Sequence, residues 1–222
     1  MFTPLAWAFT RLSYIGYPQY LRLRRRSKVS TFSIKKETIT KKRISMKKVI
    51  LSILLMLLPI LASADGCGMC GENVSYTYVS ENGLLTISGT GEMADYYDRK
   101  PWETYCDSIK TVIIEEGITS IGMRAFYSCG SLKTVTLPNS LKEINWDAFS
   151  GCVSLTDINI PNSVTSIGYG AFCYCRSLTS ITIPNTITEL DYSVFADCHS
   201  LTSINIPNSV KEIRSKAFYK CI

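Results

Sequence analysis

The stretch LTSITIPNTITELDYSVFADC, Leu178 to Cys198, decides the fold, because its pattern recurs every 23 residues along the chain. The recurring columns contain leucine, phenylalanine, cysteine and proline: Leu132, Leu155, Leu178 and Leu201; Phe126, Phe149, Phe172, Phe195 and Phe218; Cys106, Cys129, Cys152, Cys175, Cys198 and Cys221; Pro138, Pro161, Pro184 and Pro207. A period of about 20–50 residues is typical of stacked units that cannot bury their apolar faces alone. The sequence therefore predicts a solenoid with a binding surface rather than an enzyme with a pocket.

Each repeat contains the signals of a strand, a turn and a corner. In the fourth repeat, Ile181-Thr182-Ile183 alternates apolar and polar side chains, which predicts a short strand with its apolar face inward. Pro184-Asn185 ends this strand, because proline has no N–H for a ladder and favours a turn. After the next inward aliphatic residue comes Gly122, Asn145, Gly168, Asp191 or Arg214. Four of these five tolerate positive φ, so we expect a corner there, with Arg214 as an unexplained exception.

The Ala-Phe-x-x-Cys segment that follows is long enough for one helical turn, with Phe and Cys on the same inner face. Stacked coils then pair their strands in parallel, roughly 4.8 Å apart. The prediction is a mainly β, right-handed open solenoid with parallel strands and short helical turns.

The residues before the repeats predict a cap. Val74 to Val79, then Glu81-Asn82-Gly83, then Leu84 to Ile87 is typical of a β-hairpin with an Asn-Gly turn. A solenoid hides its first coil behind an atypical unit, so we expect this hairpin, over residues 72–90, at the N-terminal end of the stack. Pro101-Trp102, with Cys106 in register, indicates a degenerate coil that joins hairpin and repeats.

The pattern Leu178-x-x-Ile181-x-Ile183-Pro184-x-x-Ile187-x-x-Leu190-x-x-x-Val194-Phe195-x-x-Cys198 resembles the BspA-like (treponemal-type) leucine-rich repeat. Cys70-Gly71-Glu72-Asn73-Val74, Leu85 to Gly91 and Pro101-Trp102 are similar to the segment that precedes the repeats in that family. The resemblance implies a leucine-rich-repeat superhelix. It also implies a bacterial secreted or surface protein, of a family in which several members are implicated in adhesion to host proteins such as fibronectin.

Four segments are expected along the chain. Residues 1–45 are interpreted as an over-extended gene start, with an unusual basic leader as the alternative. Residues 46–64 have the charged start, apolar run and Ala62-Ser63-Ala64 site of a signal peptide. Residues 65–108 form the cap, and residues 109–222 form five repeats, of which the last is cut short. That last repeat stops at Cys221-Ile222, which indicates either a truncated gene or an end covered by another chain.

The predicted export signal sets the expected localisation, secreted or at the cell surface. Its apolar run is shorter than the roughly 20 residues of a membrane span, so no integral membrane segment is expected in the mature chain. A lipid anchor at Cys67 is an alternative to simple cleavage.

The charge is divided between two unlike parts of the chain. Residues 1–64 hold 13 Lys and Arg against one acid, whereas residues 65–222 hold 11 against 17. Because the basic residues lie outside the repeats, a nucleic-acid partner is not expected.

Candidate reactive groups are few. The cysteine column is interpreted as a ladder of small core hydrophobes, with bridged neighbours as the alternative. Cys67-x-x-Cys70 indicates a local disulfide or two unpaired thiols, and Cys173 lies outside the column. His199, the one histidine of the sequence, is expected in a surface loop. Without a catalytic or nucleotide-binding motif, we expect no enzyme, no cofactor and no metal.

Two surfaces are candidates for binding. The outward strand positions form a flat, hydrogen-bonding face, of the kind that repeat proteins use for partners: Thr134, Thr136, Asp157, Asn159, Ser180, Thr182, Ser203 and Asn205. A second column places Met123, Trp146, Tyr169 and Tyr192 on successive coils. These four are either a partly buried packing ladder or, if exposed, an aromatic stripe for protein or sugar contact.

The predicted function is that of a secreted or surface-associated module that binds other proteins, with a host extracellular-matrix protein as the partner that the family resemblance implies. A carbohydrate-binding or purely architectural repeat segment is the alternative.

Overall fold

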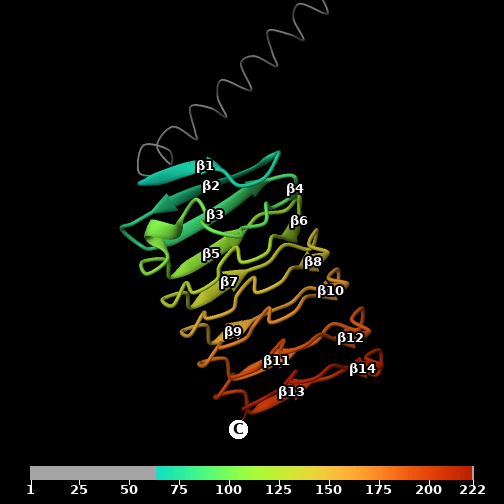
Figure 1. Cartoon of the computed structure of the whole chain (residues 1–222). Coiled ribbons are helices and arrows are strands. Elements are labelled where there is room, and N and C mark those ends of the chain that lie inside the picture. Colours follow the sequence, from blue (N-terminus) through green and yellow to red (C-terminus); the bar gives the residue numbers. More distant parts are fainter. Residues whose placement is uncertain (1–63, 222) are drawn as a thin grey trace, which may run out of the picture. The chain divides into compact units, whose positions relative to one another are not determined.

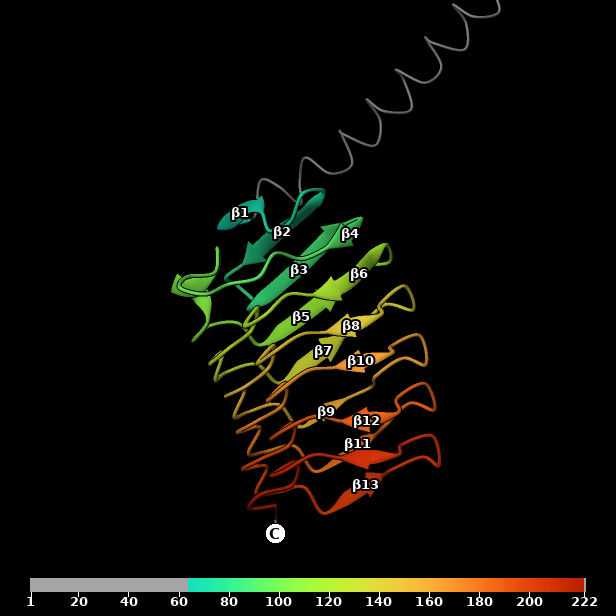
Figure 2. The same cartoon turned by 45° about the vertical axis from the view of Figure 1, so that its right-hand side comes forward.

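The structure is a computed structural model, and it describes residues 64–221. The gene-start segment 1–45 and all of the predicted signal peptide except Ala64 lie outside the described residues. In the described part the repeats form a stack of coils, with strands on two sides (Figure 1). Figure 2, turned by 45°, shows the strands of the second side lying one below another along the stack.

The first side of the stack begins with an antiparallel unit and continues in parallel. Its six-stranded sheet has the order β1 (Gly66–Met69), β2 (Val74–Val79), β3 (Leu84–Gly89), β5 (Thr111–Ile114), β7 (Thr134–Thr136) and β9 (Asp157–Ile158). Below it, β11 (Ser180–Thr182) pairs in parallel with β13 (Ser203–Asn205). Val112 is paired with Val135, and Val135 with Ile158, so each coil is in register with the next after one repeat.

The second side is parallel throughout. Its four-stranded sheet has the order β10 (Ser166–Ile167), β8 (Glu143–Ile144), β6 (Ile118–Ile121) and β4 (Gly91–Glu92). Further along, β12 (Glu189–Leu190) pairs with β14 (Glu212–Ile213). One strand on each side per coil confirms the predicted solenoid, whose stack continues from the coil of β3 and β4 to that of β13 and β14.

The predicted hairpin is present as β2 and β3. Asn82 Oδ1 accepts a hydrogen bond from the Leu84 N–H at 3.0 Å, and Gly83 has a φ of 67°, which suits glycine. The sequence did not predict β1, which pairs antiparallel with β2 and extends the cap by one strand. On its other edge β3 pairs in parallel with β5, so the same strand closes the hairpin and starts the stack.

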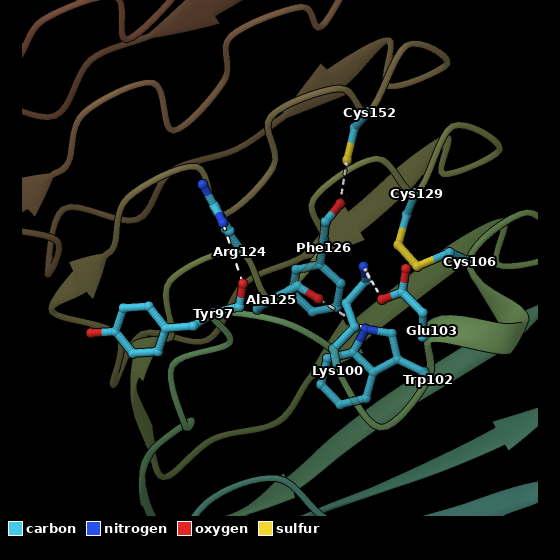
Figure 3. Close-up of polar contacts among 10 residues, drawn as sticks. All are labelled: Tyr97, Lys100, Trp102, Glu103, Cys106, Arg124, Ala125, Phe126, Cys129 and Cys152. Atoms are coloured by element: carbon cyan, nitrogen blue, oxygen red, sulfur yellow. Dashed lines mark hydrogen bonds and ion pairs between the residues drawn. A yellow bond between two sulfur atoms is a disulfide. The ribbon is translucent and has the colours of Figure 1, made fainter.

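The first coil ends in the 3-10 helix η1 (Glu103–Tyr105) and differs from those that follow. Trp102 is fully buried and stacks on Phe126, with ring centroids 5.6 Å apart. Its indole N–H donates to the Ala125 carbonyl at 2.9 Å, and Lys100 Nζ lies 2.6 Å from Glu103 Oε2 (Figure 3). Trp102 therefore occupies the position of the phenylalanine that would precede Phe126, and it closes the aromatic column at the N-terminal end of the stack.

The core is built from the repeat columns. The rings of Phe126, Phe149, Phe172, Phe195 and Phe218 stack on one another with centroid separations of 5.2–5.7 Å. Strands have the alternating burial that the sequence predicts, for example Val135 buried between exposed Thr134 and Thr136. The expected inward columns are thus confirmed, except that Ile206 and Ile213 of the last coil are 37% and 51% exposed.

The third side of each coil consists of consecutive turns. The Ala125 N–H donates to Gly122 O within the coil at 3.2 Å, whereas the Phe126 N–H donates to Ala148 O of the next coil at 2.8 Å. This alternation continues along the segment, so the expected helical turn is reduced to isolated turns whose hydrogen bonds span three residues. Within residues 64–221, η1 is the one helical element.

The expectation of positive φ at the corner is wrong for all four residues concerned, Gly122, Asn145, Gly168 and Asp191. Positive φ occurs in two later columns of each coil: Arg124, Asp147, Gly170, Ser193 and Lys216; Ser128, Gly151, Tyr174, Asp197 and Lys220. These residues belong to the turns that direct alternate N–H groups along the stack. Arg214 is therefore no exception, because its column does not need a left-handed backbone.

The cysteine column has two states. Cys152, Cys175 and Cys198 are fully buried free thiols, as predicted. Each Sγ lies 3.1–3.3 Å from the carbonyl oxygen of a phenylalanine on the preceding coil and donates to it. Cys106 and Cys129 form a disulfide, so the packing interpretation is wrong for this pair. Cys106 follows η1 rather than a regular turn, which brings its Sγ to that of Cys129 (Figure 3).

Candidate binding surfaces

The outward face of the first side is flat and polar. The hydroxyl, carboxylate and amide side chains of the predicted surface are all exposed: Thr134, Thr136, Asp157, Asn159, Ser180, Thr182, Ser203 and Asn205. Parallel pairing places Thr134 beside Asp157, Ser180 beside Ser203, and Thr182 beside Asn205. The side chains are short, so the face offers hydrogen bonds without a projecting anchor.

The aromatic column lies at the corner between the second side and the turns. Trp146, Tyr169 and Tyr192 are 57%, 46% and 45% exposed, and Met123 is half-buried beside them. Exposure on this scale favours the aromatic stripe over the packing ladder. Trp146 and Tyr169 lie edge to face, with ring centroids 6.5 Å apart and an interplanar angle of 64°.

A cleft of about 490 Å³ opens along this column, and we call it the aromatic cleft. Its walls are the four column residues together with two arginines and two aspartates: Met123, Trp146, Tyr169 and Tyr192; Arg124 and Arg214; Asp147 and Asp191. The sequence did not single out Arg124, Asp147 or Asp191 as members of this site. The sequence could have indicated these three residues by their position, since each is the immediate neighbour of a column residue: Arg124 of Met123, Asp147 of Trp146 and Asp191 of Tyr192.

Glycine at the corner provides space for the aromatic side chains. A Cβ on Gly168 would lie 2.7 Å from Cδ1 of Trp146 and only 3.1 Å from its backbone nitrogen. At Gly122 a Cβ would overlap the carbonyl oxygen of Ala94 on the preceding coil. The corner glycines are thus required for close approach of neighbouring coils, and Gly168 lets the indole of Trp146 lie across the next coil.

The charges of the aromatic cleft are partly paired. Arg124 Nε lies 3.7 Å from Asp147 Oδ2, and Arg214 Nε forms an ion pair with Glu189 and lies 3.7 Å from Glu212 Oε1. The Arg214 guanidinium also covers the Tyr192 ring, 5.3 Å from its centroid. Desolvation raises the pKa of Asp147, although Arg124 acts against this shift.

A second cleft, of about 660 Å³, lies in the cap between β1, β4 and the segment before η1. Its walls include Cys70, Glu72, Glu92 and Tyr96, and the Tyr96 hydroxyl donates to the Cys70 carbonyl at 3.3 Å. Burial raises the pKa of the Cys70 thiol to about 12, so at neutral pH it is protonated and not nucleophilic. Cys67 and Cys70 are both free, and Cys67 is exposed on β1.

The remaining reactive groups form no catalytic arrangement in the described part of the chain. His199 is exposed, as expected, and its Nε2 lies 3.4 Å from Asp197 Oδ1. Burial raises the pKa of half-buried Cys173 to about 11. Over residues 64–221, no three His, Cys, Asp or Glu side chains are grouped so as to hold a metal ion. In the same range, none of the helical structure is long and apolar enough to cross a membrane.

Comparison with known proteins identifies the repeats. The family model described as "BspA type Leucine rich repeat region" matches residues 104–222 in six copies. No curated protein is matched by the sequence of this chain.

Two solved structures share the fold. A leucine-rich repeat protein from Eubacterium ventriosum is 29% identical, with a TM-score of 0.59 over 67% of this chain and 40% of its own. A leucine-rich cell surface protein from Faecalibacterium prausnitzii is 27% identical, with a TM-score of 0.53 over 71% of this chain and 47% of its own. The present chain thus spans less than half the length of either protein.

Proposed function

Because this chain belongs to the BspA-type leucine-rich repeat family, we propose that it is an exported, surface-associated protein that binds other proteins through its solenoid and acts in adhesion. The observation that carries the proposal is the aromatic cleft. Three large aromatic side chains project from successive coils, and tryptophan, tyrosine and arginine are the residues that most often dominate binding energy at protein interfaces.

The polar strand face supports the cleft as a secondary contact. Its exposed Thr, Ser and Asn side chains provide hydrogen bonds over several coils, but lack the anchors of a hot spot. We therefore assign the specificity of binding to the aromatic cleft and a complementary role to the strand face.

Surface location rests on two supports. The sequence of residues 46–64 has the features of an export signal, and the similar protein from F. prausnitzii is described as a cell surface protein. We also propose a non-enzymatic role. It is supported by the raised pKa of the buried Cys70 thiol and by the exposure of His199, whose Nε2 lies 3.4 Å from Asp197 Oδ1.

The test is a binding screen of the purified protein against immobilised extracellular-matrix proteins and a glycan array. Trp146→Ala removes the largest exposed anchor, and Tyr174→Ala is the matched control, since Tyr174 is 44% exposed and lies under Arg176 but outside the cleft. We expect a protein ligand whose binding weakens about tenfold or more in Trp146→Ala and less than about twofold in the control. Thr182→Arg on β11 tests the strand face in the same assay.

Carbohydrate binding is the second candidate, and the combination of exposed rings with the carboxylates of Asp147 and Asp191 favours it. Glycan binding that is lost in Trp146→Ala, without any protein ligand, would replace the first proposal by this one. An absence of ligands of either class would leave the architectural role.

A further inference from the structure

The aromatic cleft has a repeat distance that matches one kind of peptide. Neighbouring parallel strands lie about 4.8 Å apart, so equivalent residues two coils apart, such as Trp146 and Tyr192, are separated by about 9.6 Å along the stack. A polyproline II helix has three residues per turn and a rise of about 3.1 Å, so the same side of the peptide returns about every 9.3 Å. A polyproline II segment that runs along the stack would therefore present equivalent side chains to Trp146 and Tyr192.

The ring orientations favour a peptide over a sugar chain. Sugars stack on the open faces of aromatic rings. Here Trp146 and Tyr169 are 64° apart, and Arg214 covers one face of Tyr192. The cleft thus presents an edge of one ring to the face of the next rather than two free faces. Grooves lined by aromatic side chains are the common recognition sites for proline-rich segments.

The charge around the cleft favours a basic ligand. Arg214 is already paired with Glu189 and Glu212, and Arg124 lies near Asp147, so both guanidiniums have carboxylate partners. Asp191 Oδ1 accepts the N–H of Tyr192 at 2.7 Å and has no cationic partner among the described residues. The cleft walls hold two carboxylates and two guanidiniums, but Glu189 and Glu212, which lie outside the walls, pair with Arg214 and leave Asp191 without a cation in the described part of the chain. The carboxylate of Asp191 complements lysine or arginine in a ligand.

We propose that the aromatic cleft binds a basic, proline-rich segment of a partner protein, held in the polyproline II conformation along the axis of the solenoid. This inference rests on the proposed function and specifies its ligand class. Prolines three residues apart contact Trp146 and Tyr192, Tyr169 lies between them, and a cationic side chain of the ligand pairs with Asp191.

The probe is a fluorescein-labelled peptide of nine prolines with two arginines at each end, titrated with the purified protein and followed by fluorescence anisotropy. A second peptide has the same arginines, with alternating glycine and serine in place of the prolines, and controls for charge alone. We expect the proline peptide to bind about tenfold or more tightly than the glycine-serine peptide. Trp146→Ala and Tyr192→Ala are each expected to weaken it about tenfold, and Tyr174→Ala less than about twofold.

Asp191→Asn separates the charge contribution from that of the rings. It is expected to weaken the proline peptide about threefold at low salt and to reduce the salt dependence of binding. Circular dichroism of each variant verifies that the β solenoid is intact, which the exposure of these side chains leads us to expect.

The outcomes distinguish this inference from the function on which it rests. Equal binding of the two peptides, or unchanged binding of the proline peptide by Trp146→Ala and Tyr192→Ala, overturns the inference. If the proline peptide does not bind, but a matrix protein binds and loses affinity in Trp146→Ala, the ligand class is wrong and the proposed function stands. If neither binds, both fail.

Discussion

Removal of one ring from the middle of the phenylalanine column tests how neighbouring coils stabilise one another. Phe172 is fully buried and stacks on Phe149 at 5.5 Å and on Phe195 at 5.6 Å. Burial of a whole phenylalanine is worth about 3–5 kcal/mol in truncation experiments, and two intact stacks place Phe172→Ala near the middle of that range, about 4 kcal/mol.

Phe218→Ala is the matched control. Phe218 is half-buried, and within residues 64–221 it stacks on one ring, that of Phe195, at 5.7 Å. The same change should therefore reduce the free energy of unfolding by roughly half as much, about 2 kcal/mol. Because repeat proteins are stabilised mainly by contacts between neighbours, Phe172→Ala should also broaden the unfolding transition by uncoupling the coils on its two sides.

The assay is urea unfolding at 25 °C, followed by circular dichroism and extrapolated linearly to water. A loss for Phe172→Ala that is no greater than that for Phe218→Ala would refute the reasoning, since the two sites differ in burial and in the number of stacked neighbours. An unchanged sharp transition would contradict the uncoupling of the two sides.

Three further predictions concern the cysteine column and Asp147. Cys175→Ala should destabilise the protein by about 1 kcal/mol with or without reductant, because the Phe149 carbonyl that loses the Cys175 thiol still accepts the N–H of Cys152 at 3.1 Å. Cys175→Asp should cost several times more, and equal losses in urea unfolding would count against an apolar ladder. Alkylation of the native protein at about pH 8 should modify exposed Cys67 and spare Cys152 and Cys198, because burial raises the pKa of both buried thiols to about 12. After unfolding without reductant, every cysteine except the disulfide-bonded Cys106 and Cys129 should be alkylated. Mass spectrometry that finds Cys175 unmodified in the unfolded protein would overturn the assignment of free thiols. Burial raises the folded-state pKa of Asp147 above its ordinary value of 3.8, so its ionisation opposes folding at neutral pH. The stability of Asp147→Asn relative to the natural protein should therefore be greatest at pH 7 and decline as the pH falls to about 3. A difference in stability that is independent of pH would exclude this cause.

The strands, the inward columns and the hairpin could be predicted from the sequence, because each depends on a local pattern. Alternation marks Val135 as buried between two exposed threonines, and Asn82-Gly83 marks the turn between β2 and β3. These patterns recur in several coils or fit few other structures, so contacts with neighbouring coils do not change the local structure that they predict.

The left-handed residues could not be predicted, because coil-to-coil hydrogen bonds determine them. Arg124 and Tyr174 are not residue types that favour positive φ, yet both lie in turns that send alternate N–H groups to the next coil. The corner glycines misled for the same reason: Gly168 leaves space for Trp146, which belongs to a different coil.

The candidate site was predicted in part. The aromatic column is visible as Trp146, Tyr169 and Tyr192 at constant spacing, but its exposure depends on the angle between the coil and the turns. The charged walls lie in columns whose residue types vary, and only the stacking brings Arg124 to Asp147. The sequence allowed bridged cysteines as the alternative to packing, but it could not single out the pair of Cys106 and Cys129, because Cys106 follows η1, whose geometry the repeat does not describe.

The strict register between coils has a consequence for how such a surface changes over evolution. Each strand pairs residue for residue with the strand one repeat away, and the rings stack with nearly constant separation. An in-frame duplication of 23 residues therefore adds a complete coil whose columns continue those already present, whereas a shorter insertion adds only a loop to one coil. Gene duplication can thus lengthen the aromatic cleft in steps of about 4.8 Å, and point mutation can then diversify each new step without disturbing the core.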